Sequence, residues 1–350
     1  MSEDQPKRPS TIKDVALAAG VSLGTASKAL NGQGQLRPGT IERVRAAARQ
    51  LNFHPNSLAQ SLLRPHSLTV GLITTDSYGR FSLPVLEGLE DVLGAAQRAV
   101  FMCNAADDPV RERQHVQALL AKRVDGIVVT ARRTDPRPAL DLDGATLPVV
   151  YAYTQVHDPQ ASCLLPDDRG GGALATRHLI RQGRRRIAHI TGAPTFEAVR
   201  QRAAGYADAL REAGLIQTPE SVLHGPWSEA WGREAVMRLY PGGRGPDAIF
   251  CGSDQIARGA LEALRDLELR MPQDVAVVGY DNWDVMADAT RPTLTSVDMN
   301  LRTLGRQAGQ RLLDLIGGGG GRGHERLPCQ LVIRQSCGAA TNGEASPPGS

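Results

Sequence analysis

TIKDVALAAGVSLGTASKAL, residues 11–30, predicts two short helices joined by a glycine-containing turn. Thr11 followed by Asp14 is typical of a capping box, and apolar residues then recur at helical spacing. Gly20 supplies the backbone conformation of a tight turn, and Ser22 is a natural cap for the second helix. This arrangement is the outline of a helix-turn-helix, whose second helix meets the edges of DNA bases.

Positive charge is concentrated at this end of the chain. Residues 1–66 hold nine Lys or Arg and four acidic residues, a net charge of +5, whereas the whole chain is +3 and the remainder is therefore −2. A basic segment on a slightly acidic body is expected when only one end meets a polyanion. The alternative is a helical hairpin that merely packs against another part of the protein, and the charge makes it the weaker interpretation.

Length and composition limit the remaining possibilities. The 350 residues suffice for a small domain and a larger, two-lobed one. There is no run of 18 apolar residues and no apolar signal core, so we expect a soluble cytoplasmic protein. The five scattered cysteines predict reduced thiols in the core. Because no phosphate loop, nucleophile elbow or dinucleotide fingerprint is present, we expect no catalytic residue, no cofactor and no metal site.

The segment after the two helices completes the headpiece. Pro38 opens a third predicted helix with an inward apolar face. Residues 54–66 then predict one short helix in which Leu58 and Leu62 lie four positions apart. A helix this short is marginal by itself in water and becomes ordered on binding, or it is an ordinary linker turn.

From Leu68 onward, apolar strands alternate with amphipathic helices, which is typical of parallel sheets. The strands predicted for a first lobe are 68–73, 99–103, 125–129 and 148–153. Those predicted for a second lobe are 162–165, 187–190, 248–251 and 275–280. Ligands of open parallel sheets lie at the carboxyl ends of the strands, so two facing lobes predict a ligand cleft.

These patterns predict an α/β protein with a three-helix headpiece, a hinge helix and a two-lobed body containing two parallel sheets. The expected domains are a helix-turn-helix DNA-binding headpiece at 1–53, a hinge helix and linker at 54–67, a two-lobed effector-binding domain at 68–341, and a disordered tail at 342–350.

With these residues laid out, the chain resembles the lactose/galactose repressor family of bacterial transcription regulators over nearly its whole length. The shared motifs are TIKDVALAAGVS (11–22), LNG (30–32), PNSLAQSL (55–62), RVDGIVV (123–129), RRRIAHI (184–190) and VVGYDNW (277–283). The resemblance implies a periplasmic-binding-protein-like body and a homodimer on a near-palindromic operator. The tail beyond Cys337 has no leucine heptad, so we expect a dimer without a tail-mediated tetramer.

The resemblance also implies the DNA contacts. Leu23, Gly24 and Lys28 match base-reading positions, and Lys28 can donate to guanine. Positions that match contacts to phosphate or backbone are Ser22, Thr25, Ser27 and Asn31 in the headpiece, and Asn56, Ser57 and Ala59 in the hinge. Leu62 matches the hinge leucine that wedges into a base step and kinks the duplex.

For the effector cleft, the matching strand-end positions are Asp76, Phe81, Tyr153, Arg202, Trp227, Ser253, Asp254 and Asp281. Carboxylates and a guanidinium suit hydroxyl-rich ligands, and an indole offers a flat face to a sugar ring. This combination favours a carbohydrate effector, while Arg80 indicates that a phosphorylated or acidic one is also admitted. Two alternatives remain for single residues: Asp254 caps the following helix, and Trp227 belongs to the core.

The resemblance implies a ligand-responsive repressor of carbohydrate-metabolism genes, in which a ligand between the lobes changes operator affinity through the hinge. Inducer and co-repressor are equally consistent with the sequence. The alternatives are a cytoplasmic sugar-binding protein, a transcriptional activator of the same fold and a sugar-converting enzyme. The basic helix-turn-helix argues against the first, and the missing catalytic signatures argue against the last.

Overall fold

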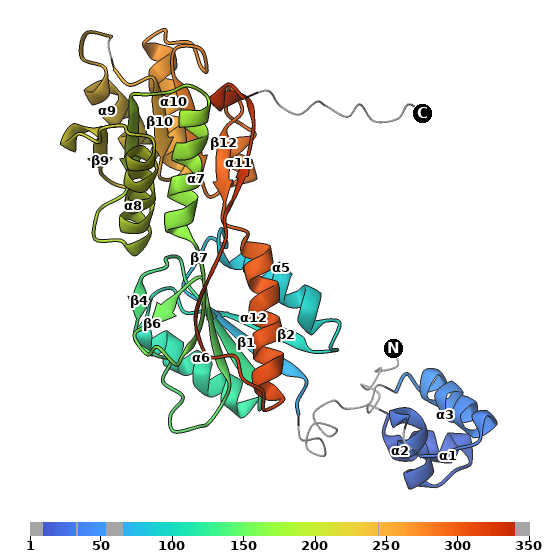
Figure 1. Ribbon diagram of the computed structural model, residues 1–350. Coiled ribbons are helices and arrows are strands. Elements are labelled where there is room, and N and C mark those ends of the chain that lie inside the picture. Colours follow the sequence, from blue (N-terminus) through green and yellow to red (C-terminus); the bar gives the residue numbers. More distant parts are fainter. Residues whose placement is uncertain (1–9, 33, 54–65, 244, 340–350) are drawn as a thin grey trace, which may run out of the picture. The chain divides into compact units, whose positions relative to one another are not determined.

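The computed structural model describes residues 10–32, 34–53, 66–243 and 245–339, and the chain divides into two compact units, Met1–Ser67 and Leu68–Ser350 (Figure 1). We refer to the described part of the first unit as the headpiece and to the second unit as the body. Each is described by itself below.

The headpiece consists of α1 (Ile12–Ala19), α2 (Leu23–Asn31) and α3 (Pro38–Gln50). The predicted capping box at the start of α1 is present, since Thr11 and the Asp14 side chain bond each other's backbone N–H groups. Gly20 ends α1 in the left-handed conformation, with φ of 62°. Apolar side chains from all three helices, among them Val15 and Val44, meet in one small core. The predicted helix-turn-helix is therefore confirmed.

The first lobe of the body is a six-stranded parallel sheet in the order β13-β7-β5-β3-β1-β2. Its strands are β1 (Thr69–Thr74), β2 (Ala99–Asn104), β3 (Gly126–Thr130), β5 (Val149–Ala152), β7 (Ser162–Pro166) and β13 (Gly323–Leu327). Its helices are α5 (Ser82–Leu93), α6 (Pro109–Ala121) and α12 (Leu301–Ile316), and a small ribbon pairs β4 (Pro136–Arg137) with β6 (Gln155–Val156). In β1, Leu72 packs with the α5 and α12 side and Ile73 with the α6 side, because successive side chains point to opposite faces.

The second lobe is a six-stranded sheet in the order β14-β12-β11-β10-β8-β9, parallel except for β14. Its strands are β8 (Ile187–Thr191), β9 (Val222–His224), β10 (Ala248–Cys251), β11 (Ala276–Tyr280), β12 (Thr295–Asp298) and β14 (Gln330–Val332). Its helices are α7 (Asp168–Arg181), α8 (Glu197–Glu212), α9 (Glu229–Leu239), α10 (Asp254–Asp266) and the short α11 (Asp284–Ala287). The 3-10 turns are η1 (Pro219–Ser221), η2 (Pro241–Gly243) and η3 (Gln335–Cys337).

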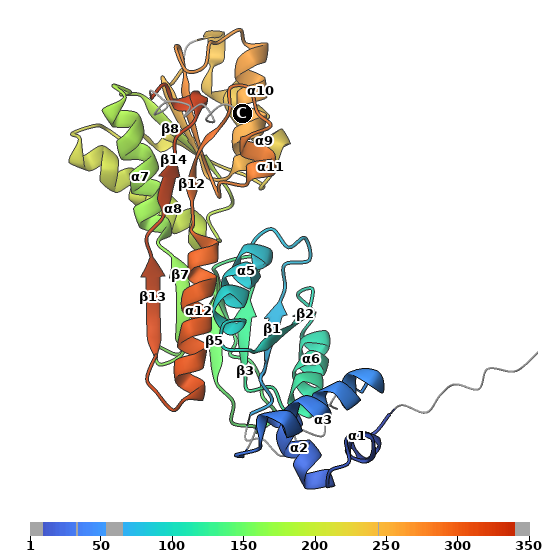
Figure 2. The same cartoon turned by 90° about the vertical axis from the view of Figure 1, so that its right-hand side faces the viewer.

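The chain passes between the two lobes three times, after β7, after β12 and after β13, and Figure 2 shows the last passage from β13 to β14. The passages are bonded to one another. The Asp167 N–H donates to the Leu327 carbonyl at 2.7 Å, and the Asn300 amide donates to the Pro328 carbonyl at 3.1 Å. These bonds hold the three segments that connect the lobes together.

The predicted lobe boundary is wrong at one strand. The segment 162–165, expected to open the second lobe, forms β7 and pairs with β5 and β13 in the first lobe's sheet. Helix α12 also returns to the first lobe, where it packs against α5 so closely that a Cβ on Gly88 would lie 2.0 Å from the Arg302 carbonyl oxygen. Alternation of strands and helices predicts the elements but does not say which sheet a strand joins.

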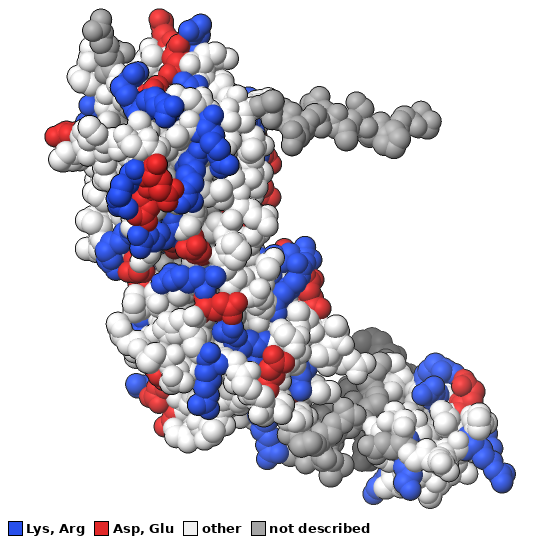
Figure 3. All heavy atoms as spheres, in the orientation of Figure 1, with Lys and Arg blue, Asp and Glu red and all other residues white. Residues whose placement is uncertain are grey.

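The surface of the body carries both signs of charge, and Figure 3 shows Lys and Arg interspersed with Asp and Glu on the face turned to the viewer. Within the described ranges, no helix combines the length and the apolar composition needed to cross a membrane.

Candidate functional site

The outer face of helix α2 carries one apolar, one basic and one glycine position. Leu23 and Lys28 are exposed, and Leu23 keeps 46% of its surface accessible. Gly24 is exposed as well, and a Cβ built on it would meet no atom of the described residues within 4 Å. Ala26 and Ala29, on the opposite side, are buried in the headpiece core. The three positions expected to read bases therefore lie on the solvent side of α2.

Four polar side chains at or near α2 form hydrogen bonds within the headpiece. Ser22 caps the helix by accepting from the Thr25 N–H at 3.1 Å, and the two hydroxyl groups also bond each other at 2.8 Å. The Asn31 amide donates to the Ser27 hydroxyl at 3.3 Å. These four side chains are thus pre-oriented by helix contacts. The hinge positions Asn56, Ser57, Ala59 and Leu62 lie outside the described residues.

In the body, a pocket of about 290 Å³ lies between the two lobes. Six of the eight residues predicted from the sequence line it: Phe81 and Tyr153 from the first lobe, and Arg202, Trp227, Ser253 and Asp281 from the second. Five of them lie between the carboxyl end of a strand and the helix that follows it, and Arg202 lies in the second turn of α8, which follows β8. Parallel strands deliver such residues to one edge of the sheet.

Aromatic rings from both lobes enclose the pocket. In the first lobe, Phe81 and Tyr153 stack with their ring centroids 4.9 Å apart, and in the second lobe the ring centroids of Phe196 and Trp227 are 6.4 Å apart. Trp227 lies close over the end of β8, where a Cβ on Gly192 would come within 2.4 Å of the indole. The rings provide flat apolar faces next to the charged groups.

Arg202 and Asp281 form the charged floor of the pocket. The Arg202 Nε donates to Asp168 at 2.8 Å, its Nη1 donates to the Gly252 carbonyl at 2.7 Å, and the same Nη1 lies 3.7 Å from Asp281. Burial disfavours the Arg202 charge, but Asp168 and then Tyr280 and Asp281 outweigh it and raise its pKa. Burial raises the pKa of Asp281, against the lowering effect of Arg80 and Arg202. Paired charges of this kind hold their positions for a ligand.

Arg80 bridges the two lobes across the pocket. It comes from the loop before α5, forms an ion pair with Asp281 and donates to the Gln255 side-chain oxygen at 3.3 Å. Its guanidinium also lies 4.6 Å from the centre of the Trp283 ring. A second bridge is the Glu197 N–H, which donates to Asp135 of the first lobe at 2.7 Å. The lobes are therefore held together by directional polar contacts.

Two predicted effector residues do not line the pocket. The Asp76 carboxylate accepts from the Phe81 and Ser82 N–H groups at 2.7 and 3.0 Å and thereby begins α5. Asp254 is fully buried, where it accepts from the Trp283 N–H at 2.7 Å and the Ser296 hydroxyl at 2.6 Å. Burial, followed by the nearby Asp281, raises its pKa to about 7. The N-cap of α10 is Ser253 rather than Asp254. Asp76 and Asp254 therefore both act by accepting hydrogen bonds from backbone N–H groups near the pocket.

The structure adds lining residues that the sequence reasoning missed. They are Arg132, Arg133, Thr134 and Asp135 after β3, Phe196 and Ala198 near the start of α8, and Gln255 in α10. The strand-end rule applied to every predicted strand would have found the residues after β3. Arg133 lies over the Phe196 ring at 4.6 Å and forms no ion pair with any described residue. Four arginines and two aspartates line the pocket, an excess of positive charge.

Comparison with known proteins agrees with this arrangement. Residues 11–56 match the description "Bacterial regulatory proteins, lacI family", and residues 176–337 match a "Periplasmic binding protein-like domain". Two relatives carry the name HTH-type transcriptional repressor PurR. The one from Haemophilus influenzae (strain PittEE) is 35% identical over 311 residues, and the one from Pectobacterium carotovorum subsp. carotovorum (strain PC1) is 34% identical over 308 residues. The alignments cover 87% of this chain and 91% and 90% of theirs.

Two solved structures give the same result at the level of the fold. The lac repressor dimer bound to operator and the anti-inducer ONPF is 28% identical with a TM-score of 0.80, over 95% of this chain and all of that one. The complex of the transcriptional regulator CelR with cellobiose is 30% identical with a TM-score of 0.65, over 93% and 99%. The headpiece, the two-lobed body and the extent of these matches together show that the chain is a DNA-binding transcriptional regulator with an effector domain, not an enzyme, and belongs to the lacI family.

Proposed function

We propose that this protein is a homodimeric repressor of carbohydrate-metabolism genes that acts in the cytoplasm, and that its effector is a sugar or a sugar phosphate. Relatives of similar identity carry the names PurR and CelR, so identity alone does not choose the effector class. The choice rests on the chemistry of the pocket between the lobes.

On DNA, the exposed face of α2 enters the major groove. Lys28 donates to base edges, Leu23 offers an apolar contact, and Gly24 lets the helix approach closely because it has no side chain. The pre-oriented hydroxyl and amide groups of Ser22, Thr25, Ser27 and Asn31 contact the backbone. Asn56, Ser57, Ala59 and Leu62 act in the minor groove, a role that rests on the family resemblance alone.

The single observation that carries the carbohydrate proposal is the combination of aromatic faces with paired charges in one pocket. The rings of Phe81, Tyr153 and Trp227 suit the C–H faces of a sugar, and Asp281, Arg202 and Ser253 offer donors and acceptors for its hydroxyl groups. The excess of arginine, with Arg133 lacking a carboxylate partner among the described residues, also admits a phosphate.

The effector acts by changing the balance between lobe arrangements. A ligand that replaces or reinforces the contacts of Arg80 with Asp281 changes how firmly the lobes hold together. A ligand shifts an equilibrium only by the difference between its affinities for the two lobe arrangements. Whether it strengthens or weakens operator binding therefore depends on which arrangement favours pairing of the two hinge segments (54–67) over DNA. Induction and co-repression are both compatible with this mechanism.

A flat heteroaromatic base is the second candidate effector. The observation that favours it is the number of rings, since Phe81, Tyr153, Phe196 and Trp227 all line the pocket. Stacked rings bind a base as well as they bind a sugar face. The two candidates differ in what else they need: a sugar uses many paired hydroxyl contacts, whereas a base uses few.

The test begins with selection of bound duplexes from a random library. Fluorescence anisotropy on the selected duplex then measures affinity across salt and with sugars, sugar phosphates and nucleobases. We expect affinity to fall steeply with salt and to change with a sugar or sugar phosphate. Lys28→Ala weakens binding and relaxes sequence preference, while the matched control Lys13→Ala, an exposed lysine on α1, leaves the preference unchanged. A response to nucleobases alone would refute the carbohydrate proposal.

A further inference from the structure

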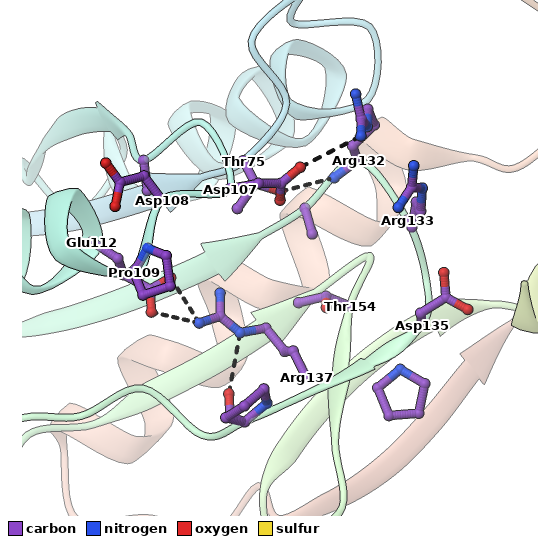
Figure 4. A pocket seen from close by; sticks show the side chains of 14 residues that line it. Thr75, Asp107, Asp108, Pro109, Glu112, Arg132, Arg133, Asp135, Arg137 and Thr154 are labelled. Atoms are coloured by element: carbon purple, nitrogen blue, oxygen red, sulfur yellow. Dashed lines mark hydrogen bonds and ion pairs between the residues drawn. The ribbon is translucent and has the colours of Figure 1, made fainter.

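The first lobe contains a second cavity of about 230 Å³ beside the pocket between the lobes (Figure 4). Its floor is formed by Thr75, Ala105, Ala131 and Thr154, which follow β1, β2, β3 and β5 within two residues. The cavity therefore lies at the carboxyl edge of the sheet, where open parallel sheets bind ligands.

The second cavity adjoins the pocket between the lobes. Arg132, Arg133 and Asp135 line both, and the adjacent residues Tyr153 and Thr154 line one each. A cavity of 230 Å³ is below the roughly 300–1,000 Å³ of a complete ligand site. It has the size for one part of a larger ligand whose other part lies between the lobes.

Two ion pairs form the polar walls of this cavity. The Arg137 Nη2 donates to both oxygens of Glu112 at 2.6 and 2.7 Å, and the Arg132 Nη2 donates to Asp107 at 3.4 Å. Figure 4 shows both pairs as dashed lines. Each pair leaves guanidinium N–H groups and carboxylate lone pairs side by side. Hydroxyl groups both donate and accept, so vicinal hydroxyls fit such walls.

Thr154 is an unsatisfied polar group in this cavity. Its side chain is 1% exposed, and its Oγ1 has no hydrogen-bond partner among the described residues. Thr134 has the same property in the pocket between the lobes. A buried hydroxyl without a partner is costly, so a ligand hydroxyl that bonds it gains affinity. Each of the two adjoining cavities thus has one such threonine.

The lining also excludes other ligand classes. No aromatic ring is found among the described residues that line this cavity, so a flat base has nothing to stack on. The lining carries four carboxylates, on Asp107, Asp108, Glu112 and Asp135, against three guanidinium groups. An added phosphate would meet this excess of negative charge, whereas a neutral group would not.

We propose that the effector contains two sugar units, one held between the lobes and a second, uncharged unit held in this cavity by Thr154 and the ion pair of Arg137 with Glu112. The proposal rests on the proposed function and narrows it to a disaccharide. It makes Thr154 a residue that determines ligand size.

Isothermal titration calorimetry on the full-length protein tests the proposal with maltose, cellobiose, lactose, trehalose and sucrose, and with glucose, galactose and fructose as their units. One disaccharide is expected to bind at least tenfold more tightly than either of its units. Thr154→Val is expected to lower that ratio by about three- to tenfold, the effect of one hydrogen bond. Thr130→Val is the matched control, because Thr130 is also buried and unpartnered among the described residues but lines neither cavity.

The outcomes separate the two proposals. The two-unit proposal is overturned if every disaccharide binds no more tightly than its units. It is also overturned if Thr154→Val and Thr130→Val change the ratio of disaccharide affinity to unit affinity equally. Either result leaves the proposed sugar effector intact. Absence of binding by every sugar of this panel overturns the two-unit proposal. If sugars and sugar phosphates also leave operator affinity unchanged in the anisotropy assay, the proposed effector class is overturned as well. Thermal unfolding of both variants checks folding, and neither is expected to melt below the wild type, since each loses an unsatisfied hydroxyl.

Discussion

Replacing Arg80 by Met removes the main charged contact between the lobes. Arg80 and Asp281 are 14% and 6% exposed in their side chains, so the ion pair is shielded from water. Methionine retains the length and the apolar stem but removes the positive charge. We expect Arg80→Met to shift the lobes of the ligand-free protein toward a separated arrangement.

The magnitude follows from opposing terms. At about 4 Å and an effective dielectric constant of 20, two unit charges attract by about 4 kcal/mol. Three features reduce this attraction. Arg80 regains hydration when the lobes part, its Nε has no hydrogen-bond partner among the described residues, and Arg202 still lies 3.7 Å from Asp281 when Arg80 is replaced. A net shift of about 1–2 kcal/mol remains, which changes the equilibrium roughly 5- to 30-fold.

Hydrogen–deuterium exchange measures this shift at one amide that bridges the lobes. The Glu197 N–H donates to Asp135 of the opposite lobe, so its protection depends on the lobes staying together. Peptides that contain Glu197 are expected to exchange roughly 5- to 30-fold faster in Arg80→Met than in the wild type.

The matched control is Arg98→Met. The Arg98–Asp125 ion pair is equally shielded, at 11% and 4% exposure, but lies entirely within the first lobe. This variant should leave exchange at Glu197 unchanged. Equal exchange in the wild type and Arg80→Met would refute the bridging role of Arg80, and equal acceleration in both variants would show a general loss of stability.

Three further predictions concern single residues. Gly24→Ala should raise the unfolding free energy of the headpiece by about 0.5–1 kcal/mol, since the added Cβ meets no atom of the described residues within 4 Å. The same variant should weaken operator binding, and unchanged affinity would place this face away from DNA. Gly205→Ala should destabilise the body by at least about 1–3 kcal/mol in chemical denaturation, because its Cβ would lie 1.9 Å from the Arg169 carbonyl oxygen. Burial lowers the pKa of His189 to about 3 from 6.5, so the unfolded chain takes up a proton below pH 6.5 that the folded protein does not. The unfolding free energy should therefore fall as pH drops from 6.5 toward 3, by up to about 1.4 kcal/mol per pH unit, and His189→Phe should remove this part of the slope; equal slopes would contradict the buried neutral imidazole.

Local signals predicted the headpiece well because its determinants are close in sequence. The capping box of Thr11 with Asp14, the left-handed Gly20 and the cap at Ser22 each depend on residues within four positions. Such features act through backbone geometry alone. The alternating strands of the body were recognisable for a similar reason, since a buried parallel strand is a short apolar run.

Long-range features were harder to predict. The pattern at 162–165 is the same whether the strand joins one sheet or the other, so its assignment to the second lobe failed. Asp254 and Asp281 both follow buried strands, and only the packed structure shows that one bonds Ser296 inside the lobe while the other faces the pocket. The contact of Arg80 with Asp281 joins residues 201 positions apart, beyond the reach of any local pattern.

The threefold passage of the chain between the lobes also affects synthesis on the ribosome. Strand β7 ends at Pro166, but the first lobe is completed only by α12 and by β13, which ends at Leu327, 161 residues later. At about 5–20 residues per second, this interval lasts roughly 8–30 s. Until α12 has been synthesised, the face of α5 that receives it has no partner from its own lobe. A nascent chain of this protein therefore exposes apolar surface until nearly all of it has been translated, which makes it a candidate for chaperone binding during that interval.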